Sequence, residues 1–445
     1  MEPPADLSPA GRTDELAGYW PSPWPAEDGG PSRRQAPEAA RSIPGLDLAP
    51  GRVLRATTRG AFAPTMCVLR EPGEVFLLSH TVGPDTVSWV ERIHPETLEP
   101  EIRSADLAGG PFWPGGIAAH ADGSLYVTYG RHCHRLDPTT LELVATRALP
   151  RDRPYNSLVV LPSGHLVMKD LGGGVGLNRL PDEFGGSELV VLAPGTLEVV
   201  ATFELPEGSI ARLSSVGQDV YVVGVSRCHR VRFDAEAGTL TLDPEWSPRY
   251  QTLEGQTYGW DIVISGDSGW FLDNGEGSEV FGGCYRGGGA STAPLHLVRV
   301  GLAGAATSSV ELVEVVGEPG GVVANPPAVD FERRIVVGFD SGHGVMTAWH
   351  FGELGEGFRP LWQREQDHAA HMLRWPGSGH LLTCDYDRER GLDQVVVLDI
   401  DSGAELARVD TGSPVQSVLF PATGWDGDAY VCTLAGVTRV FTEPA

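Results

Sequence analysis

The sequence predicts an all-β protein, a single β-propeller with eight blades, from its repeats and its composition. One phrase recurs about eight times: a short apolar run, a turn containing Pro or Asp with Ser or Gly, and a second apolar run. Clear copies are GGIAAHADGSLYVTY (115–129), YNSLVVLPSGHLVMKD (155–170) and HMLRWPGSGHLLTCD (371–385). The chain also contains 57 Gly and 35 Pro, a turn-rich composition that fits many short strands. Self-similarity at a fixed period indicates a repeat architecture.

The first segment, residues 1–50, contains ten Pro and little apolar periodicity. We therefore expect an irregular, Pro-rich N-terminal arm, followed by the propeller domain at 51–445. Three aromatic residues within six positions, Tyr19, Trp20 and Trp24, are able to attach this arm to the body, because disordered segments are poor in aromatic residues.

The repeat units follow one another along the rest of the chain. Each begins with an inner strand, continues through a hairpin turn into a second strand, and ends in weaker third and fourth strands. The predicted units are 62–110, 111–152, 153–208, 209–255, 256–318, 319–366, 367–412 and 413–445. Because the last unit stops after about three strands, we expect residues 51–58 to supply its outer edge and close the ring without open sheet edges. Seven blades is the alternative, if two units merge.

A characteristic turn connects the third and fourth strands. Its clearest form lies in VVVLDIDSGAELARVDTG (395–412), with related turns in LDPTTLELV (136–144) and LAPGTLEV (192–199). These segments resemble the repeats of quinoprotein-like and YVTN-type β-propellers. The resemblance implies the fold rather than an activity, because many functions share this turn. Members that bind pyrroloquinoline quinone carry a vicinal disulfide, and no two of the six Cys are adjacent here, so we do not expect that cofactor.

Charge and composition exclude several classes of partner. The formal net charge of −26 opposes phosphate backbones and anionic lipids, so we expect neither nucleic acid nor a membrane as partner. No run of about 18 apolar residues is long enough to span a bilayer. The N-terminus lacks a basic head followed by an apolar core, which favours a cytoplasmic protein. The sequence does not indicate an oligomeric state.

Polar residues gather at two kinds of position. The inner strands of a propeller begin on the face from which the loops between second and third strands protrude. The strand starts carry Asn156, Asp261, Asn325, His368, His371 and Gln416, and the loops carry His80, Lys169, Asp170, Asp273, Asn274, Asp340, His343, Asp385 and Asp387. Because separate blades direct polar groups toward one axis, we predict a site for a small molecule in the central funnel.

A divalent metal fits part of this set. The predicted ligands are His368, His371, Asn325, Asp261, His80 and His343. Asn and Asp oxygens suit Ca²⁺, whereas the histidines favour a transition metal. The channel lined with Asn and Asp is similar to that of calcium-dependent lactonase propellers.

The same set predicts an enzyme that acts on a small organic molecule, most narrowly a metal-assisted hydrolase of lactone or ester type. Asp261, Lys169 or His371 would move the proton. Lys169 is the single lysine beside 32 arginines, and an ammonium group can lose its proton where a guanidinium cannot. The predicted substrate contacts are Trp260, Asn156, Gln416 and Asp170. Two alternatives stay open: a metal-dependent oxidoreductase or cyclase that uses the funnel histidines, and a binding scaffold without chemistry.

Overall fold

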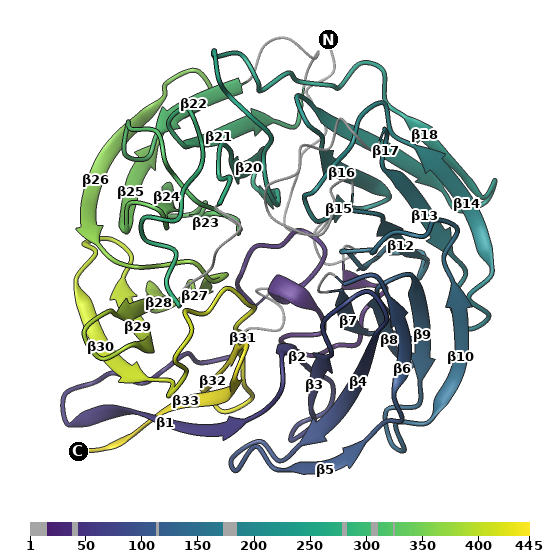
Figure 1. Ribbon diagram of the computed structural model, residues 1–445, viewed down its shortest axis with the longest axis horizontal. Helices are drawn as coiled ribbons and strands as arrows, with labels where there is room; N and C mark the ends of the chain where they lie inside the picture. The colour runs from purple at the N-terminus through teal and green to yellow at the C-terminus, as the bar shows by residue number, and fades with distance from the viewer. Residues whose placement is uncertain are drawn as a thin grey trace.

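The computed structural model describes residues 16–37, 43–112, 115–171, 185–277, 283–303, 310–323 and 325–445. Within these residues the chain forms eight antiparallel sheets that stand as blades in a ring around one axis (Figure 1). The predicted eight-bladed β-propeller is therefore confirmed. In the same residues, no helix combines the length and hydropathy that a membrane crossing requires.

Each blade is a meander that runs outward from the axis, and its strands are grouped here by their place in the blade. The innermost strands of blades one to eight are β2 (Pro64–Leu69), β7 (Gly116–Ala119), β11 (Val159–Val160), β15 (Ser214–Val216), β19 (Val263–Ser265), β23 (Ala328–Asp330), β27 (Leu373–Trp375) and β31 (Ala422–Thr423). The second strands are β3 (Val75–His80), β8 (Leu125–Tyr129), β12 (Leu166–Lys169), β16 (Asp219–Val223), β20 (Ser268–Leu272), β24 (Ile335–Asp340), β28 (His380–Asp387) and β32 (Ala429–Thr433).

The third and outermost strands complete each blade. The third strands are β4 (Thr86–Ile93), β9 (His132–Leu136), β13 (Glu188–Leu192), β17 (Cys228–Asp234), β21 (His296–Gly301), β25 (Val345–Phe351), β29 (Leu392–Asp399) and β33 (Gly436–Pro444). The outermost strands are β5 (Pro100–Arg103), β10 (Leu143–Ala148), β14 (Val199–Glu204), β18 (Thr239–Leu242), β22 (Val310–Glu314), β26 (Phe358–Glu365), β30 (Glu405–Asp410) and, in blade eight, β1 (Arg52–Gly60). In blade one, β6 (Leu107–Gly110) also pairs with β4.

Blade eight joins the two ends of the propeller domain. Its outermost strand β1 pairs antiparallel with β33, in a register that runs from Arg52 opposite Pro444 to Gly60 opposite Gly436. Figure 1 shows this pair at the lower edge of the ring, with the C-terminus beside it. The predicted closure is confirmed, and it leaves no unpaired seam between the first and last blades.

The burial of the strands explains the repeated sequence phrase. The second strands β3 and β8 are buried along their whole length, since both of their faces pack against neighbouring blades. The outermost strands β10 and β14 alternate between partly buried and exposed positions. A strand buried on both faces has a nearly continuous apolar sequence, whereas a strand with one solvent-exposed face alternates apolar and polar residues. The inner half of each blade is therefore easier to recognise in the sequence.

The turn between third and fourth strands has a physical basis. In three blades it ends on a leucine with positive φ, at Leu98 (65°), Leu141 (56°) and Leu197 (59°), and all three are buried. Each leucine N–H donates to the carbonyl four residues earlier, as Leu141 does to Asp137 at 2.8 Å. Gly403 has the same role in blade seven, with φ 70° and a bond to Asp399 O at 2.8 Å. A positive φ is strained for leucine, so burial of its side chain in the blade must offset that strain.

The N-terminal arm lies on the axis. Residues 1–15 and 38–42 fall outside the described residues, but residues 16–37 run through the middle of the ring, where Figure 1 shows the 3₁₀ turn η2 (Glu27–Gly29) in purple. Tyr19 and Trp24 are buried, and Tyr19 Oη accepts a hydrogen bond of 2.7 Å from Val160 N. The aromatic residues of the arm therefore do pack against the body.

The position of the arm follows from the edges of the innermost strands. These edges face the axis, and their backbone groups need partners once water is excluded. The arm supplies backbone partners to five blades. The bonds join Trp20 to Ala119, Trp24 to Leu69, Pro31 to Ser215, Ser32 to Ile264 and Gln35 to Arg374, at 2.7–2.9 Å.

Candidate functional site

The arm brings charges to the axis, where they meet the residues predicted to be catalytic. We call Glu27, Asp28, Arg33, Arg212, Asp261 and His371 the axial network; every one of them is at most 5% exposed. Arg33 pairs with Glu27 and, at 3.1 Å, with Asp28. His371 Nδ1 lies 3.0 Å from Asp28 Oδ1. Burial acts to raise the pKa of Asp28, but His371 and Arg33 outweigh it and hold that pKa below its usual value.

The other half of the axial network surrounds Asp261. Arg212 Nη1 lies 2.8 Å from Glu27 Oε2, which connects this half to the arm. Asp261 Oδ1 accepts a hydrogen bond of 2.7 Å from Arg212 N, and its Oδ2 lies 3.9 Å from Arg212 Nε. The middle of the ring therefore holds buried charged groups. Asp261 and His371 form their contacts with the protein's own charged groups.

Lys169, the third predicted catalytic residue, is fully buried at the end of β12. Its Nζ donates to Asp170 O at 2.8 Å and to Ser209 O at 2.9 Å. Burial lowers the pKa of Lys169 to about 7, although Asp170 and Asp261 act in the opposite direction. An amine with this pKa exchanges a proton near neutral pH, which suits general acid–base chemistry.

The single lysine makes this pKa directly measurable. In protein labelled with ¹³C and ¹⁵N in lysine only, the Cε–Nζ group gives one NMR signal, and we expect it to titrate with a midpoint near pH 7. Because the unfolded chain retains the ordinary value of 10.5, urea should move the midpoint upward by several pH units. A midpoint near 10 in the folded protein would show that the ammonium group stays hydrated and would remove Lys169 as an acid–base candidate.

The predicted substrate contacts are buried in separate surroundings. Asn156 Nδ2 donates to Ile210 O at 2.7 Å, while its Oδ1 has no hydrogen-bond partner among the described residues. Trp260 is buried, and its Nε1 is likewise unpartnered in that part of the chain. Gln416 Nε2 donates to Asp367 O at 2.8 Å. Asp170 pairs with Arg153 at 3.2 Å.

The predicted metal ligands are not gathered in one place. In the described part of the chain, no three His, Cys, Asp or Glu side chains meet at a point suited to a metal ion. His343 Nδ1 lies 2.8 Å from Asp340 Oδ2, and His80 Nδ1 lies 2.9 Å from Thr81 O. His368 Nδ1 accepts a hydrogen bond of 3.2 Å from Cys384 N, and Asn325 Nδ2 donates to Ala369 O. Burial lowers the pKa values of His80 and His368 to about 4, so both rings are neutral at pH 7. The divalent metal stays a prediction.

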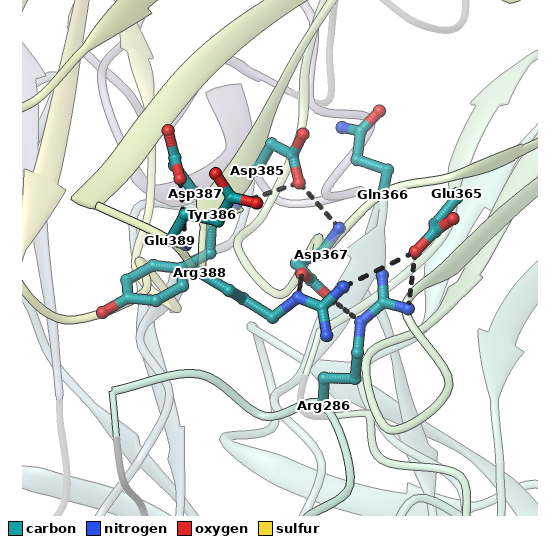
Figure 2. Close-up of a pocket in the computed structure, with 9 residues that line it drawn as sticks. All are labelled: Arg286, Glu365, Gln366, Asp367, Asp385, Tyr386, Asp387, Arg388 and Glu389. Atoms are coloured by element: carbon teal, nitrogen blue, oxygen red, sulfur yellow. Dashed lines mark hydrogen bonds and ion pairs between the residues drawn. The ribbon is translucent and has the colours of Figure 1, made fainter. Parts of the chain in front are cut away.

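A cavity opens at the rim on which the inner strands begin, between blades six and seven. We call it the rim cavity; its volume is about 540 Å³. Its walls come from the ends of β26 and β28 and from the long connection between β20 and β21. The lining residues, drawn in Figure 2, are Arg286, Glu365, Gln366, Asp367, Asp385, Tyr386, Asp387, Arg388 and Glu389.

Four charged side chains of the rim cavity form a closed ring of ion pairs. Arg286 Nε lies 2.5 Å from Asp367 Oδ1, and its Nη1 lies 2.9 Å from Glu365 Oε1. Arg388 Nε lies 3.3 Å from Asp367 Oδ2, and its Nη2 lies 3.7 Å from Glu365 Oε1. Figure 2 shows both guanidinium groups turned toward Asp367. Burial raises the pKa of Asp367, while the two arginines act in the opposite direction.

Sequence reasoning identified part of this arrangement. It selected Asp385 and Asp387 as loop residues but missed Arg286 and Arg388, because arginines are frequent on the surface of this chain. It also missed Glu27, Asp28 and Arg33. The one signal for these three was the presence of several charges inside a Pro-rich, aromatic segment.

Comparison with known proteins supports the fold and leaves the activity open. No family model matches the chain, and no curated protein matches it. A quinohemoprotein alcohol dehydrogenase from Comamonas testosteroni is similar, with a TM-score of 0.60 and 10% identity over 98% of this chain and 81% of that chain. A quinohemoprotein alcohol dehydrogenase from Pseudomonas putida HK5 has a TM-score of 0.61 and 10% identity, over 100% of this chain and 83% of that chain. BamB from Moraxella catarrhalis has a TM-score of 0.54 and 12% identity, over 87% of this chain and 97% of that chain. The predicted quinoprotein-like resemblance is thus confirmed for the fold.

Proposed function

We propose that this propeller is a binding protein that takes a small polar molecule in the rim cavity. The observation that carries the proposal is the contrast between the two polar sites. On the axis, the arm's own charges contact Asp261 and His371 through the axial network, and each of these two side chains is at most 3% exposed. At the rim, polar groups surround about 540 Å³ of open space. That volume lies within the usual range for small-molecule sites.

The lining favours a polar molecule. Ligand pockets are usually apolar with a few placed polar groups, whereas seven of the nine lining residues of the rim cavity are charged. The ion-pair ring holds Arg286 and Asp367 in place without a ligand. A preorganised site loses less side-chain entropy on binding than a mobile one.

The predicted hydrolase is a second candidate, and one observation favours it. Burial brings the pKa of Lys169 to about 7, a value suited to moving a proton. The NMR titration described above tests this candidate. Similar structures include dehydrogenases and BamB, so the fold itself favours neither catalysis nor binding.

The proposal is tested by blocking the rim cavity. Glu389 is exposed at the cavity wall, and we expect Glu389→Trp to fill part of the space and abolish the rise in melting temperature that small polar compounds confer on the wild type. The panel contains 1,4-diaminobutane, 1,4-butanediol and succinate, which share four carbons and differ in charge. The matched control, Glu353→Trp, places the same side chain at an exposed site in the turn between β25 and β26 and should keep the rise. An equal rise in both variants would contradict a binding site at the rim.

A further inference from the structure

The rim cavity has an excess of hydrogen-bond acceptors. Five of its lining side chains are carboxylates and two are guanidinium groups. Both guanidinium groups contact Asp367 and Glu365 in the ion-pair ring. Since each arginine already faces two carboxylates, the ring offers no unneutralised positive charge to an anion. The groups that can still accept a hydrogen bond are therefore the ones that decide what the cavity binds.

Three further carboxylates line the cavity beside the ring, and one of them, Asp385, pairs with Arg408 at 2.8 Å. Asp387 Oδ1 accepts hydrogen bonds from Glu389 N at 3.1 Å and Arg390 N at 3.0 Å, which fixes the turn. Its Oδ2 lies 3.6 Å from the nearest Arg390 nitrogen, and the side chain is 25% exposed. The Glu389 side chain has no ion-pair partner among the described residues. The carboxylates of Asp387 and Glu389 can both receive a donor from a bound molecule.

The amide of Gln366 supports the wall of the cavity. Gln366 lines the cavity and is 2% exposed. Its Nε2 donates to Thr383 Oγ1 at 2.6 Å and to Cys384 O at 2.8 Å. Because the Cys384 carbonyl can only accept a hydrogen bond, the Gln366 amide nitrogen must face it, and the Gln366 amide oxygen points the other way. That Oε1 is buried without a partner in the described part of the chain. That oxygen has almost no accessible surface, so a molecule in the cavity does not reach it, and the Gln366 amide instead holds the cavity wall against β28.

We infer that the rim cavity binds a small organic cation, one that carries an ammonium or guanidinium group. This inference rests on the proposed function and names the chemistry of its ligand. Ammonium and guanidinium groups supply donors and positive charge to the carboxylates of Asp387 and Glu389, which line the cavity outside the ion-pair ring. The ring of Tyr386, on the same wall, adds an aromatic surface that attracts cations. The net charge of −26 raises the local concentration of cations and lowers that of anions.

Calorimetric titration of the full chain tests the inference with three probes of equal length. We expect 1,4-diaminobutane to bind at least tenfold more tightly than 1,4-butanediol or succinate, and to bind more weakly as salt is added. Asp387→Asn keeps the oxygen that caps the turn but removes the charge, and it should weaken diamine binding about tenfold. Glu389→Gln should act in the same direction. The control, Asp401→Asn, makes the same change of net charge in the turn between β29 and β30, on an exposed side chain at the opposite edge of blade seven, and should leave the affinity within twofold.

The outcomes separate this inference from the proposed function. Diamine binding that is equal in Asp387→Asn and Asp401→Asn would reflect the overall charge alone and would overturn the cation site. Binding of succinate or 1,4-butanediol that Glu389→Trp abolishes would overturn the cation inference and leave the rim cavity as the binding site. Failure of all three probes to bind the wild type would overturn both.

Discussion

Replacement of Arg33 by methionine is expected to lower the free energy of unfolding by about 3–5 kcal/mol, because it removes the guanidinium group that pairs with two buried carboxylates and leaves their negative charge only partly compensated. Arg33 is 2% exposed, pairs with Glu27 and Asp28, and donates from Nε to Leu213 O at 2.6 Å. Methionine retains much of the apolar stem, so the loss reports the charge and hydrogen bonds rather than an empty space. Urea denaturation followed by intrinsic fluorescence measures the change.

The control for this prediction is Arg55→Met on β1. Arg55 also pairs with a carboxylate, Glu443, at 2.7 Å, but its side chain is 56% exposed. An ion pair in solvent contributes less than about 1 kcal/mol. Similar losses in the two variants would show that the charges of the arm are hydrated, which contradicts their burial on the axis.

Replacement of Asp393 by asparagine is expected to stabilise the protein increasingly as the pH rises. Asp393 on β29 is buried; its Oδ1 accepts from Ser417 N at 2.9 Å and its Oδ2 from Thr411 Oγ1 at 3.1 Å. Burial raises the pKa of Asp393 from 3.8 to about 8, although these hydrogen bonds act in the opposite direction. The folded state therefore keeps a proton that the unfolded chain releases above about pH 4.

The sign of the pH dependence follows from this difference in protonation. Between about pH 4 and pH 8 the folded state binds more protons at Asp393, so the stability that this side chain contributes falls as the pH rises, and the loss is complete above about pH 8. The asparagine side chain has no carboxyl proton to lose. The free energy of unfolding of the variant should therefore rise, relative to that of the wild type, by about 3–5 kcal/mol across that range. Melting temperatures at pH 5 and pH 8.5, with exposed Asp401→Asn as control, measure it. Parallel profiles for wild type and Asp393→Asn would contradict the raised pKa.

The sequence was sufficient to predict the architecture because the repeat is local. Each unit places its apolar runs and turns within about 50 residues, and the turn that ends at Leu98, Leu141 or Leu197 marks the same point in successive blades. The pairing of β1 with β33 also followed from counting strands, since a closed ring needs a fourth strand in its last blade.

The candidate site depended on contacts that the repeat does not contain. Two of the polar residues predicted at the inner strands, Asp261 and His371, lie buried in the axial network. The contacts that join the arm to this network are far apart in sequence, because Glu27 and Arg212 are separated by 185 residues and Asp28 and His371 by 343. No periodicity connects the arm to the blades, so the charges that occupy the axis could not be assigned from the sequence. The rim cavity could not be predicted for the same reason, because Arg286 contacts Asp367 from another blade.

Hydrogen–deuterium exchange of residues 16–37 in the full chain tests most directly whether the arm fills the axis and leaves the rim as the place for a ligand. The amides of Tyr19, Trp20, Gly29, Arg33 and Gln35 donate to carbonyls at 2.9–3.2 Å. We expect them to exchange as slowly as the innermost strands, through global unfolding. Exchange within seconds, at the rate of an unstructured peptide, would contradict a filled axis and would return Asp261 and His371 to an open funnel.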